Sequence, residues 1–468
     1  MENPGSFVWI FFLSQRNNMT LIRGISGIRG IVNNGLNADV VSDHMKAFSQ
    51  LQPEGTILVA RDSRSHGAEL IEAACFALAT SGRDVINCDI IPTPTAQFLV
   101  EKNGYSGGIV ITASHNPPEW NGMKFIDNNG CFLDATQNSR LFNLADEAES
   151  LEEGAVGTIT EDQGGIKLHI THTTQLSVVD TKSIRNRKFK VVVDAVNGGA
   201  AIALPQMIEA LGCEVITINC TPNGKFPRGA EPLPHNLKQL GEEVRKHGAH
   251  VGFATDPDGD RLAVVDELGN PLGEEYTLTI CADGILSAHD VATPLVTNLS
   301  TTMALDKVSE KYKNTVERSS VGEINVVNLM KEKNSILGGE GNGGVILPES
   351  HYGRDSLVGA TLFLNRMSQT SDSVSKIFAS MPQFYMVKDK IELGNVNPNK
   401  ALYIISETFK DCEQNTIDGL KLIWEDSWVH IRKSNTEPII RIYAEATSTQ
   451  LAKELVTNIK RCIQYTEK

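Results

Sequence analysis

The sequence predicts an α/β protein of four domains, in which three α/β domains with mixed sheets precede a C-terminal α+β domain. Three observations support this fold class. The chain has 468 residues, which is enough for three or four domains of ordinary size. Short apolar runs alternate with segments of helical period over most of the chain, and this alternation indicates βαβ units. The pattern changes to longer alternating runs near the C-terminus.

The α/β pattern begins with the apolar run ILVA at residues 57–60, which is expected to form a buried strand. The following segment, 64–80, places Ile71, Ala74 and Leu78 on one face of a helix. Further strands are expected at 84–90, 107–112, 190–199, 214–220, 250–256, 261–266 and 294–300. Because helical segments separate many of these strands, the sheets should be largely parallel.

The C-terminal pattern is different. Residues 418–446 contain two alternating runs joined by a turn-rich segment, and an amphipathic helix is expected at 448–463. Strict alternation is typical of antiparallel strands with one face buried, so this region is predicted as an α+β domain. The predicted domains are residues 19–155, 156–257, 258–370 and 371–468.

Residues 1–18 are treated separately because a second methionine, Met19, opens the segment MTLIRGISGIRG. The apolar run FVWIFFL within them is similar to the core of a signal peptide. It is preceded by Glu2 and by no Lys or Arg, and no small-residue cleavage site follows it. We therefore expect an upstream extension from a misplaced start codon, with an export signal as the alternative.

Composition excludes several classes of protein. Lys and Arg total 43 against 57 for Asp and Glu, which gives a formal charge of −14 and argues against general binding of nucleic acid or acidic membranes. No apolar stretch has the roughly 18 residues that a transmembrane helix needs. The eight cysteines are dispersed without a C-x-x-C pair, which favours small buried side chains in a reducing cytoplasm.

The stretch GGIVITASHNPPEWNGMKF, residues 107–125, places Ser114 where a buried strand ends. Side chains at the carboxyl ends of parallel strands face the crevice in which α/β proteins bind ligands. A polar strand end with a turn-forming serine is the alternative interpretation. A serine hydrolase is disfavoured because the G-x-S-x-G motif is absent and because His115, as the adjacent residue, should point away from Ser114.

The stretch DPDGDRLAVVD, residues 256–266, holds Asp256, Asp258 and Asp260 in a segment kept non-helical by a proline and a glycine. Three neighbouring carboxylates repel one another unless a cation binds, and an all-oxygen ligand set selects a hard ion such as Mg²⁺. An EF-hand is excluded because Arg261 stands where that loop needs glycine. A solvated acidic turn remains the alternative.

Two further stretches are candidates for ligand binding. The loop GGEGNGGVI, residues 338–346, surrounds Glu340 with glycines, so its carboxylate could bind vicinal sugar hydroxyls. The segment RKSNTEPIIR, residues 432–441, could instead be an ordinary hairpin turn, but its polar side chains could also hold a phosphate. The candidate phosphate ligands are Arg432, Ser434, Asn435, Thr436 and Arg441.

Together these groups indicate phosphoryl transfer on a phosphorylated sugar, in a cleft where four domains meet. The motifs TASHNPPEWNGMKF, DPDGDR and RKSNTEP, in this order, make residues 19–468 similar to the α-D-phosphohexomutase superfamily, which includes phosphoglucomutase, phosphomannomutase and phosphoglucosamine mutase. The resemblance implies three related α/β domains and a TATA-binding-protein-like C-terminal domain around a central cleft.

The resemblance also implies an isomerase that interconverts hexose 6-phosphate and hexose 1-phosphate through a phosphoserine and a 1,6-bisphosphate intermediate. Glucosamine phosphate is the best candidate substrate, and glucose or mannose phosphate is the alternative; a Mg²⁺-dependent sugar phosphatase is the weaker one. The implied cofactors are Mg²⁺ and the hexose 1,6-bisphosphate. The expected partners are sugar phosphates, with neither nucleic acid nor membrane, and the expected state is a monomer or homodimer.

Residue roles follow from the same resemblance. Ser114 would carry the phosphoryl group and, with the three aspartates, hold Mg²⁺. Lys124 would act as general acid or base, and a base near neutral pH would need a lowered pKa. The remaining implied roles are transition-state stabilisation by Arg29 and Arg261, support of the serine loop by His115, sugar contacts by Glu340 and Asn342, and binding of the other phosphate by Arg432, Ser434, Asn435, Thr436 and Arg441.

One departure from the family pattern stands out. Many relatives have Gly-Glu-x-Ser-Gly-His in the sugar loop, whereas this chain has Asn342 and Gly344 at the serine and histidine positions. The loop histidine that could serve as an acid/base partner is therefore missing. His351 lies nearby in sequence, but no physical argument assigns it that role.

Overall fold

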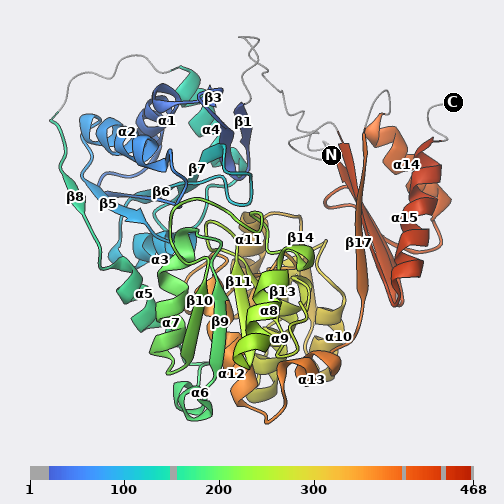
Figure 1. Cartoon of the computed structure of the whole chain (residues 1–468). Helices are drawn as coiled ribbons and strands as arrows, with labels where there is room; N and C mark the ends of the chain where they lie inside the picture. Colours follow the sequence, from blue (N-terminus) through green and yellow to red (C-terminus); the bar gives the residue numbers. More distant parts are fainter. Residues whose placement is uncertain (1–20, 148–154, 393–396, 434–438, 465–468) are drawn as a thin grey trace.

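The structure is a computed structural model that describes residues 21–147, 155–392, 397–433 and 439–464. Figure 1 shows a series of sheets flanked by helices, with the C-terminal sheet standing to one side of the rest. The predicted N-terminal extension, residues 1–18, lies outside the described residues, and so do Ser434, Asn435 and Thr436. Within the described ranges, no helix is long and apolar enough to cross a membrane.

The first domain is built on an eight-stranded sheet. Its elements are β1 (Leu21–Gly24), β2 (Gly27–Val32), β3 (Gly35–Leu36), α1 (Ala38–Leu51), β4 (Ile57–Arg61), α2 (Gly67–Thr80), β5 (Val85–Ile90), α3 (Thr93–Asn103), β6 (Gly107–Ile111), β7 (Trp120–Ile126), α4 (Ala135–Asp146) and β8 (Ile159–Glu161). The strand order is β1-β2-β7-β6-β4-β5-β8, with β3 paired to β2, and β4 is parallel to both β5 and β6.

Helices cover both faces of this sheet, which explains why β6 is apolar without alternation. Ile109 and Ile111 pack in the layer that contains Phe48 of α1. Val110 points the other way and packs with Phe98 of α3. Since β6 is buried on both faces, its carboxyl end is the natural place for a polar side chain to leave the core.

The second and third domains each contain a four-stranded mixed sheet. The second comprises α5 (Gly165–Thr173), α6 (Thr181–Arg187), β9 (Lys190–Asp194), η1 (Gly199–Ala201), α7 (Ala203–Ala210), β10 (Glu214–Ile218), η2 (Pro234–Asn236), α8 (Lys238–His247), β11 (Val251–Thr255) and β12 (Leu262–Val265). The third comprises α9 (Glu275–Ala288), β13 (Leu295–Asn298), α10 (Ala304–Lys311), β14 (Val316–Ser319), α11 (Glu323–Lys333), β15 (Gly338–Glu340), β16 (Gly344–Ile346), α12 (Ser356–Ser368) and α13 (Val374–Ala379).

The strand orders are β10-β9-β11-β12 and β14-β13-β15-β16, and in each sheet the last strand is antiparallel to its neighbour. The two sheets share one apolar core, in which Phe253 of β11 meets Phe363 of α12 with ring centroids 5.8 Å apart. Both antiparallel hairpins, β11–β12 and β15–β16, carry residues predicted to form the site.

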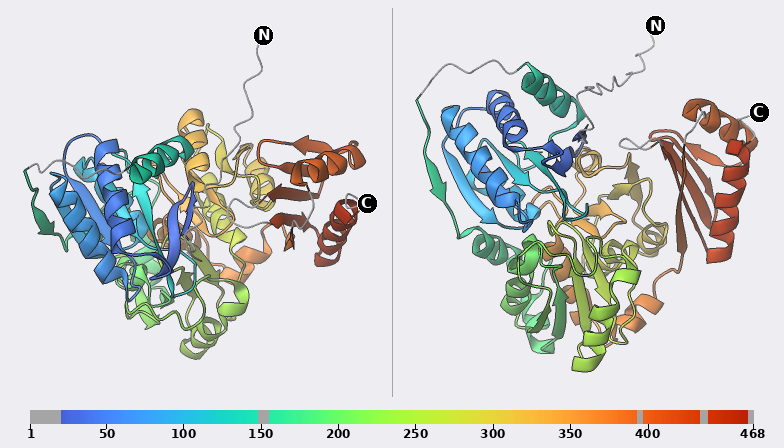
Figure 2. Two further views of the ribbon diagram at one scale, coloured as in Figure 1. Left: turned by 90° about the horizontal axis from the view of Figure 1, so that it is seen from above. Right: turned by 45° about the horizontal axis from the view of Figure 1, so that its top comes forward.

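The fourth domain is a five-stranded antiparallel sheet. It comprises β17 (Tyr385–Glu392), α14 (Pro398–Thr408), β18 (Glu413–Asn415), β19 (Leu420–Trp424), β20 (Ser427–Lys433), β21 (Ile439–Ala446) and α15 (Thr449–Gln464). The order is β17-β21-β20-β19-β18, and both helices cover one face (Figure 2). The helix-covered face forms its own core, in which Leu422 and Ile442 pack with Val456.

The predicted fold class is confirmed: three α/β domains with mixed sheets precede an α+β domain. Two details differ from the sequence prediction. The two alternating runs expected within 418–446 form three strands, because a turn at Glu425 and Asp426 splits the first run into β19 and β20. The elements also cross all three predicted domain boundaries. β8 joins the first sheet although it lies beyond residue 155, β12 joins the second sheet beyond residue 257, and α13 packs beyond residue 370 in the core that the second and third domains share.

Candidate active site

Ser114 lies in a tight turn after β6, with its backbone in the left-handed region at φ 49°. Neighbouring groups fix this conformation. The Ser114 N–H donates to Oγ1 of Thr112 (2.9 Å), whose hydroxyl donates to Asp62 (2.6 Å). Arg64, paired with Asp62, donates to the carbonyl oxygens of Ser114 (2.9 Å) and Asn116 (2.6 Å). A non-glycine residue at positive φ persists only where such contacts determine it.

The hydroxyl of Ser114 faces the acidic triad, which we define as Asp256, Asp258 and Asp260. The triad occupies the turn between β11 and β12, and Ser114 Oγ is 3.3 Å from Asp256 Oδ2. All three carboxylates are buried, and one ligand oxygen from each lies within 4.8 Å of the others. The structure therefore brings the serine and the triad, which the sequence proposed as one site, within contact distance of each other.

The triad has the donor set of a divalent cation site. Oδ1 of Asp258 and Oδ1 of Asp260 are buried and have no hydrogen-bond partner among the described residues. Buried carboxylate oxygens without partners are costly unless something neutralises them. An all-oxygen set of this kind fits a hard ion such as Mg²⁺ better than a softer transition metal.

The pKa values of Asp256 and Asp258 are shifted in opposite directions. Burial raises the pKa of Asp256 well above its usual range, and the neighbouring Asp260 and Asp258 add to this effect. Burial acts on Asp258 in the same sense, but the ammonium of Lys124 outweighs it and holds the pKa of Asp258 far below its usual range. A bound cation would favour the ionised form of all three groups.

Lys124 is one of the cations that neutralise the triad. It comes from β7, and its buried Nζ lies 2.6 Å from Asp258 Oδ2 and 3.0 Å from Asp260 Oδ2. Burial favours the neutral amine, but the two carboxylates outweigh burial and raise the pKa of Lys124. This is the opposite of the lowered pKa that a general base near neutral pH requires, so Lys124 is held as the ammonium in this arrangement.

Two arginines and a histidine line the other side of the serine turn. Arg29 of β2 donates to Asn116 Oδ1 (2.8 Å), and Arg261 donates to His115 Nδ1 (3.1 Å). Burial and the charges of Arg261 and Arg29 hold the pKa of His115 well below its usual range, so its imidazole is neutral. His115 Nδ1 approaches Ser114 Oγ to 3.4 Å, closer than two side chains pointing apart would come, but long for a hydrogen bond.

The sugar loop, residues 338–346, forms the β15–β16 hairpin. Both oxygens of Glu340 are held by protein groups: Asn298 donates to Oε1 (2.7 Å), and Arg354 donates to Oε2 (2.7 Å). Asn342 also donates to Oε2 at 3.2 Å. Burial alone would raise the pKa of Glu340, but Arg354 and Asn298 lower it, so this carboxylate is ionised.

Comparison with known proteins fits this arrangement. Four domain patterns described as "Phosphoglucomutase/phosphomannomutase", alpha/beta/alpha domains I, II and III and the C-terminal domain, match residues 20–152, 167–269, 274–385 and 395–461. The chain belongs to the phosphoglucomutase/phosphomannomutase family. This confirms the predicted family and, with it, the predicted class of intramolecular phosphotransferase.

Individual members of the family align over nearly the whole chain. A protein of Thermococcus kodakarensis named "Phosphoglucomutase/phosphomannomutase" is 34% identical over 92% of this chain and 96% of its own length. A "Probable phosphoglucosamine mutase" of Methanopyrus kandleri is 31% identical over 94% and 98%. A crystal structure of a "Phosphoglucomutase/phosphomannomutase family protein" from Burkholderia thailandensis has a TM-score of 0.84 at 27% identity, over 95% and 97%.

Arg354 is a site residue that the sequence did not predict. Its guanidinium is buried and contacts Asp260 and Glu340, both predicted site residues, and also Glu323 at the start of α11. Arg64, which holds the serine turn, was missed as well. Neither residue lies in one of the recognised motifs, and no local pattern around them points to the site.

The C-terminal candidates lie on a separate sheet. Arg432 of β20 and Arg441 of β21 stand directly opposite each other in the strand pairing, at the ends nearest residues 434–438. The other predicted phosphate ligands, Ser434, Asn435 and Thr436, fall outside the described residues. In all three views of the chain this sheet stands apart from the domain that carries Ser114 (Figures 1 and 2).

His351, left without a role by the sequence, belongs to a second buried cluster. Nε2 of His351 (3.1 Å) and Nε2 of His169 (3.0 Å) face one oxygen of Asp355, whose other oxygen caps the N-terminus of α12. The hydroxyl of Thr95 meets His169 at 3.0 Å. Because these residues come from the first three domains, their contacts join these domains to one another.

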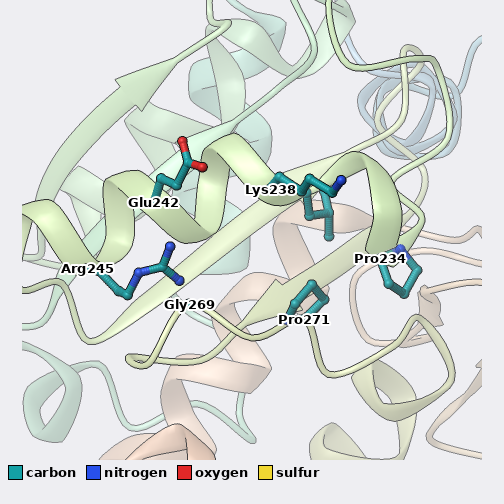
Figure 3. Close-up of a pocket in the computed structure, with 7 residues that line it drawn as sticks. Pro234, Lys238, Glu242, Arg245, Gly269 and Pro271 are labelled. Carbon is teal, nitrogen blue, oxygen red and sulfur yellow. The ribbon is translucent and has the colours of Figure 1, made fainter.

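A surface pocket beside α8 lies outside the candidate active site. It is lined by Pro234, Leu237, Lys238, Glu242, Arg245, Gly269 and Pro271 (Figure 3). None of the predicted site residues is among them. The candidate active site is therefore defined by the serine turn, the triad and the sugar loop.

Proposed function

We propose that this chain is a phosphohexose mutase that interconverts hexose 6-phosphate and hexose 1-phosphate, with Ser114 as the residue that carries the phosphoryl group. The observation that supports this most directly is the 3.3 Å approach of Ser114 Oγ to a buried aspartate of the triad. A hydroxyl held beside three buried carboxylates suits phosphoryl transfer better than acyl transfer. The imidazole nitrogen that faces Ser114 Oγ, His115 Nδ1, already accepts a hydrogen bond from Arg261, so it is not free to take the serine proton as the base of a hydrolase does.

The triad would hold Mg²⁺ together with the phosphorylated Ser114. When bound, such an ion supplies positive charge that stabilises the transferring phosphoryl group and its entering and leaving oxygens. The chain's own cations would act beside it: Arg29 and Arg261 flank the serine turn and can neutralise the equatorial oxygens. His115, neutral and held by Arg261, would keep the serine loop in position.

The reaction would proceed in two half-reactions. First, the bond between phosphorus and Ser114 Oγ breaks while a bond to the free hydroxyl oxygen of the hexose phosphate forms, which gives the 1,6-bisphosphate. The hydroxyl of the hexose gives up its proton in this step, and the departing Ser114 Oγ takes one up. Lys124, which contacts Asp258 and Asp260, would relay this proton by donating from its ammonium to the serine oxygen and by taking up the proton of the hydroxyl. The bisphosphate then reorients, and its other phosphoryl group returns to Ser114.

Binding of the sugar would use residues from two domains. Glu340 and Asn342 of the sugar loop would contact hydroxyl groups. The phosphate that is not being transferred would be held by the C-terminal domain, through Arg432, Ser434, Asn435, Thr436 and Arg441. This division explains why a mutase needs a phosphate site separate from Ser114, which a sugar phosphatase would not need.

Glucosamine phosphate is the proposed substrate, and glucose or mannose phosphate is the alternative. The name of the Methanopyrus kandleri relative supports the first choice, and that of the Thermococcus kodakarensis relative supports the second. Substrates that differ only at the second sugar carbon can be separated by contacts worth about 1–3 kcal/mol. We further propose a cytoplasmic enzyme, since all eight cysteines are free thiols.

Phosphoenzyme formation tests the central assignment. Wild-type protein incubated with Mg²⁺ and hexose 1,6-bisphosphate carrying labelled phosphorus should retain label after denaturation, and Ser114→Ala should retain none. The matched control is Ser287→Ala, on the exposed end of α9, which should label as the wild type does. Label on Ser114→Ala would show that another residue carries the phosphoryl group.

The choice of substrate follows from kcat/KM for the 6-phosphates of glucosamine, mannose and glucose, each with its own 1,6-bisphosphate. Mutase activity should convert each accepted sugar phosphate without net release of inorganic phosphate. Stoichiometric release of inorganic phosphate from all three sugars would favour the phosphatase instead.

A further inference from the structure

One buried guanidinium connects the triad to the sugar loop. Each of the three nitrogens of Arg354 contacts a different carboxylate: Nη2 lies 2.7 Å from Asp260, and Nη1 lies 2.7 Å from Glu340. Nε lies 2.9 Å from Glu323 at the start of α11. The planar fork of arginine is the side chain best suited to hold several carboxylates in fixed directions.

The space for this guanidinium exists because residue 344 is glycine. A Cβ added to Gly344 would lie 2.2 Å from Cδ and 2.7 Å from Cγ of Arg354. The backbone of Gly344 is not in the left-handed region, so an L-residue could adopt its conformation. The glycine is therefore required by the neighbouring side chain and not by its own backbone.

We propose that Arg354 is a positioning residue that couples the metal site to the sugar loop, and that Gly344 is the position that admits it. Through Asp260 it orients one carboxylate of the triad, and through Glu340 it orients the carboxylate proposed to bind the sugar. A side chain at residue 344 and Arg354 in its present place exclude each other. The proposal rests on the proposed function: its sugar half needs a hexose phosphate as substrate, and its metal half needs the Mg²⁺ site proposed at the triad.

The coupling makes a prediction that a purely structural role does not make. Loss of the arrangement should weaken metal binding and sugar binding together, because one guanidinium holds both carboxylates. A residue that only filled space would lower the melting temperature and leave both affinities unchanged. Partners that orient metal ligands typically contribute about 10- to 100-fold to metal affinity or activity.

The test uses the full-length protein and three variants: Gly344→Ala, Arg354→Ala and the double variant. Mg²⁺ binding is measured by isothermal titration calorimetry without sugar, and KM and kcat are measured with the preferred hexose phosphate. Gly344→Ala should weaken Mg²⁺ binding and raise KM, each by about tenfold, because its methyl group displaces Arg354. The double variant should be no worse than Arg354→Ala, because removing Arg354 relieves the clash.

Two controls keep the outcome interpretable. Gly24→Ala in β1 adds a methyl group with no atom within 4 Å and should behave as the wild type. Arg354→Lys keeps a positive charge without the fork and should recover part of the stability, but neither affinity, which separates positioning from charge. If Arg354→Ala does not fold, Gly344→Ala and Arg354→Lys still carry the test.

The proposal is overturned if Gly344→Ala matches Gly24→Ala in both Mg²⁺ affinity and KM, or if the losses of the two single variants add in the double variant. If the wild type converts no hexose phosphate, the proposed function fails while the calorimetric comparison still decides the link between Arg354 and Asp260.

Discussion

At the scale of single residues, the site depends on one unfavourable backbone conformation. Ser114 is held at φ 49°, at a cost of about 1 kcal/mol or more. Hydrogen bonds from Arg64 and to Thr112 offset this cost. The strained turn aims Oγ at Asp256, whereas an extended continuation of β6 would not fix that direction. The conformation therefore supports the assignment of Ser114 as the reacting group.

Removal of one triad carboxylate tests the metal site at this scale. Asp258→Asn should weaken Mg²⁺ binding by more than about tenfold, because it removes an anionic oxygen ligand while the amide keeps the side chain's shape. Lys124 retains Asp260 at 3.0 Å, so the fold should survive. The Mg²⁺ concentration that gives half-maximal activity is the measurement.

The control for this experiment is Asp39→Asn, an exposed carboxylate in the first turn of α1. It changes the net charge equally but should leave the Mg²⁺ response unchanged. An Asp258→Asn enzyme with the wild-type Mg²⁺ response would contradict the assignment of the triad.

At the scale of elements, glycines allow the triad's turn to pack closely. Gly259, at φ +72°, would place a Cβ 2.9 Å from the Cβ of Ala200, and a Cβ on Gly198 would lie 2.5 Å from the Pro257 carbonyl oxygen. The turn is thus pressed against η1 of its own domain. The sequence indicated that Pro257 and Gly259 prevent a helix there, but Gly198 is some sixty residues away and gave no local signal of this contact.

The helix α1 should make the first domain sensitive to acid. His44 is buried in α1, where burial outweighs its hydrogen bond to the Val40 carbonyl and lowers its pKa from 6.5 to about 4. The folded protein therefore binds this proton less tightly than the unfolded chain. The full stability is present above pH 6.5 and is lost progressively as the pH falls toward 4, by about 2 kcal/mol at pH 5.

Thermal melting between about pH 7.5 and pH 5 measures this effect. His44→Gln, which cannot take up a proton, should show a flatter dependence of melting temperature on pH. His289→Gln, at an exposed position after α9, should keep the wild-type slope. Equal slopes for all three proteins would mean that His44 does not contribute.

At the scale of the whole molecule, the sequence predicted the fold class correctly, because the elements have local signals, and its motifs pointed to residues that the structure brings together at Ser114 and the triad. Alternating apolar runs predicted strands such as β4 and β6, and short motifs located Ser114 and the triad. Arg354 could not be found this way, because its importance comes from Asp260, Glu323 and Glu340, which are distant in the chain. Contacts between separate segments form only in the folded molecule, so a local sequence pattern does not reveal them.

The four domains are not equally joined. The second and third share one apolar core, whereas the fourth has a core of its own. The fourth domain meets the third through polar contacts: Lys421 Nζ donates to the Leu299 carbonyl oxygen (2.7 Å), and the Met303 N–H donates to Glu445 (2.8 Å). An interface made of such contacts permits relative motion more readily than a shared core does.

We therefore expect the fourth domain to move toward the other three when a bisphosphate binds. The ligand would bridge the serine site and the phosphate-binding residues of the fourth domain, and its binding energy would favour the closed arrangement. Small-angle X-ray scattering should show a smaller radius of gyration with hexose 1,6-bisphosphate than without it. Ser114→Ala should still close, since it keeps the phosphate-binding arginines, whereas Arg432→Ala should stay open. Identical scattering of the wild type with and without saturating bisphosphate would rule out closure.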